Sequence, residues 1–178
     1  PLNAKENRHT IVSTAAGNDT NSLGAISCVA PASLFPNGVN TYSFRLGNAL
    51  RAPQFDSLAL SEGIKFKLTV DSSNTGLTYL YALLIKESTP EVHPANMGPR
   101  FIVKISDSTN KVIDCYYKLF VPGSTGIQTL KNGVNEGTGQ WKYSDWTKVQ
   151  LDLTPYLGQQ ITIEFITADC FPSPYSIS

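Results

Sequence analysis

The chain of 178 residues has few of the residue types that carry chemistry or bind polyanions. It contains two histidines, one methionine and three cysteines, and charged residues make up only 16% of it. Basic and acidic residues balance at 14 each, so the charged surface that nucleic-acid partners require is absent from the composition. No apolar run approaches the roughly 20 residues that span a bilayer, so we expect no direct membrane insertion.

The scarcity of histidine limits the reactions that the chain could catalyse. A Ser or Cys nucleophile needs a neighbouring base, and only His9 and His93 could serve. His93 lies in a proline-rich loop, where a structural or surface role is expected. The carboxylates are scattered and cannot be paired from sequence as glycoside hydrolysis requires. We therefore predict that the protein is not an enzyme.

The three cysteines, Cys28, Cys115 and Cys170, match neither zinc nor redox spacing. In an exported protein two of them would pair and one would be left over. Cys115 and Cys170 both lie in or at the end of strand-like segments, so this pair is the first to consider. The alternative is three buried free thiols, because a free cysteine packs like a small apolar side chain.

Two segments near the C-terminal end alternate apolar and polar residues most clearly. Every second residue from 149 to 153 is Val or Leu, and every second residue from 161 to 165 is Ile or Phe. Alternation with period two marks half-buried strands. The short Pro-Tyr-Leu-Gly corner at 155–158 indicates a β-sandwich edge, where the chain passes from one sheet to the other.

Further strands are expected along most of the chain, and no segment between them reads as a helix. The 78–85 stretch is almost wholly apolar, which predicts a central strand covered on both faces. Two long loops are expected at 87–100, which holds three prolines, and at 123–139. The other expected strands are 10–13, 25–32, 42–46, 51–60, 64–70, 101–105 and 112–119.

This density of short strands predicts an all-β fold, an antiparallel two-sheet β-sandwich of jelly-roll type. Residues 1–23 are polar and are expected to form a flexible leader or linker, and 24–178 the sandwich domain. No signal peptide is visible and the chain does not begin with Met, so we expect a mature or excised segment whose targeting signals have been removed.

Aromatic residues gather on both sides of the 123–139 loop. An aromatic face offers a rigid contact area to the apolar face of a sugar. Trp141 and Tyr143 are expected in a loop and therefore exposed, whereas Trp146 opens a strand and is expected in the core. The sequence thus predicts a glycan-binding site formed by Tyr116, Tyr117, Trp141 and Tyr143.

A structural calcium ion is the cofactor that this fold class favours. Ca²⁺ accepts flexible oxygen coordination from loop carboxylates and carbonyl groups. The candidate ligands are Asn48, Asp56 and Asp169, although no EF-hand loop or nonapeptide repeat is present.

Several short motifs occur together in one order over about residues 40 to 170. The motifs are Arg45-Leu46-Gly47-Asn48, Tyr81-Ala82-Leu83-Leu84-Ile85, Pro99-Arg100-Phe101-Ile102-Val103, Asp114-Cys115-Tyr116-Tyr117, Trp146-Thr147-Lys148-Val149, Asp152-Leu153, Tyr156-Leu157-Gly158 and Thr167-Ala168-Asp169-Cys170. In this order they resemble the β-sandwich domains of large surface proteins in gliding and related Bacteroidota. Those proteins leave the cell by type IX secretion and often carry PKD-like repeats. More distantly, the fold looks like the jelly rolls of carbohydrate-binding modules and MAM-type adhesion domains.

The end of the sequence departs from this family. Its members usually continue after Asp-Cys with a Gly-Gly-His-Phe-Gly-Tyr-type closing strand, whereas 171–178 holds Pro172 and Pro174. Two prolines so close together cannot form a central strand. Either the sandwich lacks the closing strand or another segment takes its place. The first option leaves an open sheet edge to which a partner strand could add.

The resemblance implies a non-catalytic module, extracellular or at the cell surface, that serves adhesion and gliding motility. A rigid sandwich would present the 87–100 and 123–139 loops to a glycan or a cell-surface protein. Its other partners would be further domains of the same polypeptide. One alternative is a carbohydrate-binding module of a secreted polysaccharide-degrading enzyme, and another is a structural spacer that binds nothing.

Overall fold

The computed structural model describes residues 9–19, 22–35, 38, 40–47, 61–88, 98–121, 130–136 and 139–168. In these ranges the chain forms β-strands and short 3-10 turns without any α-helix. Every pair of neighbouring strands runs antiparallel. The prediction of an all-β, antiparallel fold is therefore confirmed.

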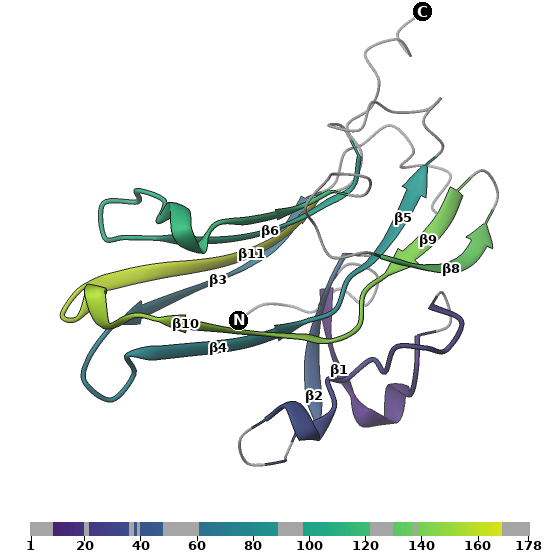
Figure 1. The fold of residues 1–178 in the computed structure, drawn as a ribbon, viewed down its shortest axis with the longest axis horizontal. Coiled ribbons are helices and arrows are strands. Elements are labelled where there is room, and N and C mark those ends of the chain that lie inside the picture. Colours follow the sequence, from purple (N-terminus) through teal and green to yellow (C-terminus); the bar gives the residue numbers. More distant parts are fainter. Residues whose placement is uncertain are drawn as a thin grey trace, which may run out of the picture.

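The largest sheet has four strands, in the order β3, β11, β6, β7 (Figure 1). These strands are β3 (Ser61–Thr69), β11 (Gln160–Ala168), β6 (Arg100–Ser106) and β7 (Lys118–Phe120). β11 is paired on both sides, with β3 along its whole length and with β6. The alternation over 161–165 thus belongs to an interior strand of this sheet.

A second layer faces this sheet. It begins with β4 (Gly76–Tyr81), which pairs with β10 (Thr147–Asp152). The next strand after β4, β5 (Leu84–Ser88), pairs with β9 (Gly139–Tyr143), the strand just before β10. On its other side β9 pairs with β8 (Lys131–Glu136).

Two tight arches connect the layers, one from β3 to β4 and one from β10 to β11. The second contains a 3-10 turn, η6 (Thr154–Tyr156), and Gly158 at a φ of 78°, a backbone conformation that glycine adopts without strain. Backbone N–H groups of Gly158 and Leu153 donate to Val70 and Thr75 at 2.8 and 2.7 Å, which ties the arches together. The sheet change expected at 155–158 is confirmed, because β10 and β11 belong to different sheets.

The hydrophobic core lies between the layers in two adjoining clusters. Residues from β6 and β11 are buried in it together with residues from the arches and from β4. Burying such side chains is the main favourable term in folding. The first cluster comprises Val70, Ile105, Ile113, Leu153, Ile161 and Ile163, and the second Tyr79, Leu83, Ile85, Phe101, Val103 and Phe120.

The N-terminal part forms a separate ribbon, in which β1 (His9–Ser13) pairs with β2 (Tyr42–Leu46). Both strands were expected. The strand expected at 25–32 is wrong. Among the described residues this segment has one isolated bridge, from Ser27 to Asn18, and a 3-10 turn, η3 (Ala32–Leu34). The expected boundary between 23 and 24 falls inside a turn that the Asp19 N–H closes by donating to the Ile26 carbonyl at 2.8 Å.

Three other expectations need correction. The 78–85 stretch is not one central strand. It breaks at Ala82 and Leu83, and in the described part of the chain β4 pairs only with β10 and β5 only with β9. The 112–119 stretch is interrupted by a 3-10 turn, η5 (Asp114–Tyr116). Within the 123–139 stretch, 131–136 form strand β8 and 139 begins β9, and the two strands pair antiparallel. The loop prediction is wrong for these residues, whereas 123–129 and 137–138 lie outside the described residues.

A charged row crosses the outer face of the four-stranded sheet. Glu164 lies between Lys65 and Lys104 in the register of the three strands, with N–O distances of 3.5 and 2.7 Å. The hydrogen bond from Lys104, and more weakly its charge and that of Lys65, hold the pKa of Glu164 below its ordinary value of 4.5. This row links the edge strand to the interior of the sheet.

Glu164→Gln is expected to lower the free energy of unfolding by roughly 1 kcal/mol at neutral pH. Because folding lowers this pKa, the contribution is complete above pH 4.5 and is lost as the pH falls through the folded-state value. Denaturant unfolding of wild type and variant should therefore differ at neutral pH and converge in acid. Asp114→Asn, at an exposed position, is the control. A difference in unfolding free energy between wild type and Glu164→Gln that is the same at acidic and neutral pH would contradict the prediction.

Candidate functional site

The aromatic residues predicted to bind a ligand at 141 and 143 lie on a strand. Trp141 and Tyr143 belong to β9, which pairs with β5 on one side and with β8 on the other. Their expected position in a loop is therefore wrong. The alternation of Gln140 and Lys142 with the two aromatic residues is the sequence signal that indicates this strand.

Tyr143 is a packed residue. Only 9% of it is exposed, and it lies opposite Leu84 of β5 and Lys131 of β8. The Lys131 Nζ is 5.9 Å from the centre of the Tyr143 ring, within the range of a cation–π contact. Tyr143 thus supports the surface and positions Lys131, and its ring is too covered to serve as a stacking platform.

Trp141 is the more accessible of the two. It is half-buried and lies on the same face of β9 as Tyr143, because side chains two apart on a strand point the same way. Lys86 of β5 lies opposite it in the register. This face of the β5–β9–β8 sheet therefore presents an indole ring opposite Lys86, with Lys131 at the next position of the same face, opposite Tyr143.

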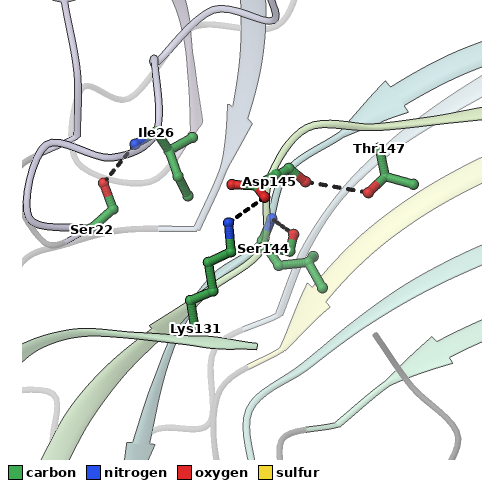
Figure 2. A network of polar contacts seen from close by, with 7 residues as sticks. Ser22, Ile26, Lys131, Ser144, Asp145 and Thr147 are labelled. Carbon is green, nitrogen blue, oxygen red and sulfur yellow. Dashed lines mark hydrogen bonds and ion pairs between the residues drawn. The ribbon is translucent and has the colours of Figure 1, made fainter. Parts of the chain in front are cut away.

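An exposed ion pair borders this face. Lys131 Nζ contacts Asp145 Oδ2, and 55% and 62% of the two side chains are exposed (Figure 2). The hydrogen bond that Lys131 donates to Asp145 is the main reason that the pKa of Lys131 is raised. On the other face of β9, Lys142 Nζ donates to Asn132 Oδ1 at 2.7 Å. Lys131 and Asp145 were not predicted from the sequence, because their pairing depends on the β8–β9 register.

The backbone beside the ion pair is firmly held where β9 gives way to β10. Ser144 is buried, its N–H donates to the Leu83 carbonyl at 3.0 Å, and its Oγ accepts the Leu83 N–H at 2.9 Å. Figure 2 shows Ser144 next to Asp145, whose carbonyl accepts a 3.3 Å hydrogen bond from Thr147 Oγ1. A rigid strand junction thus carries one half of the exposed ion pair.

The N-terminal turn is fixed to this junction by Trp146. The Trp146 Nε1 donates to the Ser27 carbonyl at 2.9 Å, which explains why this indole is half-buried. Within the turn, Ser22 is fully buried and its Oγ accepts the Ile26 N–H at 3.1 Å (Figure 2). Trp146 was expected in the core, but it is half-buried, belongs to neither core cluster and precedes β10.

The other two predicted aromatic residues lie at the opposite end of the layers. η5, which contains Tyr116, is next to η6 at one end of the sheets, whereas β9 is at the other (Figure 1). The Tyr116 hydroxyl donates to the Asp152 carbonyl, and its ring is 6.1 Å from that of Tyr156. Tyr116 is thus committed to packing, while Tyr117 is 39% exposed. The structure does not bring the four predicted residues into one site.

The predicted calcium ligands Asn48, Asp56 and Asp169 all lie outside the described residues. Within the described ranges no three His, Cys, Asp or Glu side chains are grouped closely enough to hold a metal ion. His93 and Cys170 also lie outside the described residues. Cys115 is a free cysteine, so the expected Cys115–Cys170 disulfide is wrong. Cys28 is half-buried, and burial raises the pKa of its thiol. Cys115 is exposed, so the alternative of three buried thiols is wrong at this position.

No known protein family, curated protein or solved structure matches the chain. In the part of the chain that the structure describes, no helix is long and apolar enough to cross a membrane. The assignment of the candidate site therefore rests on the geometry of its residues. It is the face of the β5–β9–β8 sheet that carries Lys86, Trp141, Tyr143 and Lys131, with Asp145 beside it.

Proposed function

We propose that the protein is a non-catalytic module, extracellular or at the cell surface, that binds a glycan through the β5–β9–β8 face. The half-buried Trp141, opposite Lys86 and on the same face as Tyr143 and Lys131, is the observation that carries this proposal. The proposed architecture is a jelly-roll-like β-sandwich. Two facing antiparallel layers around a shared core support it. The module would serve adhesion and gliding within a larger polypeptide.

The chemistry of this face suits a sugar. An indole ring offers apolar area at low entropic cost, and the axial C–H groups of a pyranose form a matching apolar patch. The Lys131–Asp145 pair supplies a donor and an acceptor beside the ring, and hydrogen bonds of this kind fix the orientation of a ligand. Lys86 and Lys131 together favour glycans that carry carboxylate or sulfate groups.

The proposed ligand-binding surface is a sheet face, whereas the sequence predicts ligand contact through loops at 87–100 and 123–139. Part of the second range is instead strand β8, which supplies Lys131. A sheet face holds its side chains with less conformational freedom than a loop, so less entropy is lost when a ligand binds.

Trp141→Ala is expected to weaken glycan binding about tenfold or more, because a central Trp often contributes the largest share of a binding energy. A glycan array probed with the labelled protein identifies the ligand, and calorimetry with that ligand gives the affinity of each variant. Trp141→Phe should retain part of the affinity, since the phenyl ring preserves some of the stacking area.

Tyr117→Ala is the matched control, because Tyr117 is an exposed aromatic residue that directly follows η5, and η5 lies at the other end of the layers. It should bind as wild type does. Thermal unfolding of each variant shows whether weaker binding comes from the lost contact with the ligand or from a loss of folding. An array without any bound glycan, or equal affinities for wild type and a folded Trp141→Ala, would contradict the proposal.

A further inference from the structure

The second layer covers the four-stranded sheet unevenly. On β6 the core-facing residues Phe101, Val103 and Ile105 are all buried, and on β11 Ile161 and Ile163 are buried. On β3 none of the core-facing side chains is buried to that extent. Ile64 and Leu68 are half-buried and Phe66, opposite Ile163 in the register, is 55% exposed. Burial thus decreases step by step toward the β3 edge.

β3 is an edge strand in the part of the chain that the structure describes. It pairs with β11 through all nine residues, and no described strand pairs with its other side. Alternate residues of such a strand direct N–H and C=O groups away from the sheet, where they can pair with another chain. A long edge strand with an exposed core-facing Phe is a site for strand addition.

The outer face of this edge is positively charged. Lys65 and Lys67 are both exposed. Lys65 lies 3.5 Å from Glu164, but Glu164 is shared with Lys104, which is closer at 2.7 Å. Lys67 lies opposite the uncharged Thr162. A strand added beside β3 would therefore meet two lysines on one face and Phe66 between them on the other.

We propose that β3 binds an extended acidic segment of a partner polypeptide by strand addition. The segment carries carboxylates opposite Lys65 and Lys67 and an apolar residue opposite Phe66, because successive residues of a strand alternate between faces. The bound segment covers the exposed ring of Phe66, and its carboxylates pair with Lys65 and Lys67. Its backbone forms hydrogen bonds with the outward N–H and C=O groups of β3. This site is separate from the glycan face.

A second copy of the chain fits this edge poorly. The antiparallel register that pairs all nine residues of β3 places Lys65 opposite Lys65 of the other copy. The register centred on Phe66 places each Lys65 opposite Lys67. Directly opposed like charges destabilise a strand pair. The lysines thus select against self-association and for an acidic partner.

Two synthetic nine-residue peptides test the proposal, one alternating Glu with Val and one alternating Lys with Val. Fluorescence anisotropy measures their affinities, and amide hydrogen exchange locates the binding strand. The Glu peptide should protect amides of β3, and the Lys peptide should bind roughly tenfold more weakly, since two cross-strand charge pairs change sign. Salt should weaken the binding of the Glu peptide.

Lys67→Glu tests the charge contribution without disturbing the Glu164 row, because Lys67 faces Thr162. It should lower the affinity for the Glu peptide by about fivefold. Lys148→Glu on β10, also at an exposed position, is the control and should bind as wild type does, as should Trp141→Ala. Three results would overturn the proposal: unprotected β3 amides with both peptides, equal affinities for the two peptides, or dimers of the protein alone that protect β3.

Discussion

Leu153→Ala is expected to lower the free energy of unfolding by about 3 kcal/mol. Leu153 is fully buried in the first core cluster, at the arch where the chain passes from β10 to β11. Truncation removes buried methyl groups and leaves a cavity in a region that cannot collapse easily. The Leu153 N–H is fixed by a 2.7 Å hydrogen bond to the Thr75 carbonyl, and both neighbouring strands are paired.

Leu157→Ala is the matched control, because it changes the same residue type in the same arch where the side chain is 55% exposed. Its effect should stay within about 0.5 to 1 kcal/mol. Urea unfolding of the three proteins gives the free energies, and equal slopes would show that the denatured states are comparable. Similar losses for the two variants would mean that this arch does not close over the core as described.

Alkaline pH is expected to destabilise the wild type through Tyr79. Burial, and to a smaller extent the neighbouring Tyr81, raises the pKa of Tyr79 from 10.0 to about 12. Tyr79 is 9% exposed, and its ring packs edge-on against that of Phe165, with 5.2 Å between the ring centroids. Because the folded-state pKa is the higher one, the contribution is complete below pH 10 and is lost as the pH rises to about 12.

Tyr79→Phe should therefore remove about 2 kcal/mol of this pH dependence. The measurement is the unfolding free energy of wild type and variant at neutral pH and at several values between pH 10 and pH 12. Tyr42→Phe, at a position that is 64% exposed, is the control and should follow the wild type. Parallel curves for wild type and Tyr79→Phe would contradict the expected burial of the hydroxyl.

The strands that could be predicted from the sequence are those whose pattern is complete within one segment. β3, β6, β10 and β11 each alternate with period two over at least five residues, and this period depends only on local backbone geometry. The corner at 155–158 could also be predicted, because proline and glycine restrict the backbone locally.

The features that were missed depend on partners far away in the sequence. The break at Leu83 occurs where both of its backbone groups bond to Ser144, 61 residues later, and an apolar run contains no sign of this. The Gly and Asn residues of 123–139 suggested a loop and obscured β8. The predicted ligand-binding residues are close in sequence, but η5 and β9 lie at opposite ends of the layers.

An NMR titration with the glycan selected on the array tests the central claim most directly. We predict that the Trp141 indole N–H signal shifts with the largest amplitude and that Lys86, Lys131 and Asp145 shift with it, while Tyr117 does not. The same ligand should leave the spectrum of Trp141→Ala almost unchanged. Shifts that concentrate around Tyr117, or a spectrum that no glycan changes, would contradict the assignment of a glycan site to the β5–β9–β8 face.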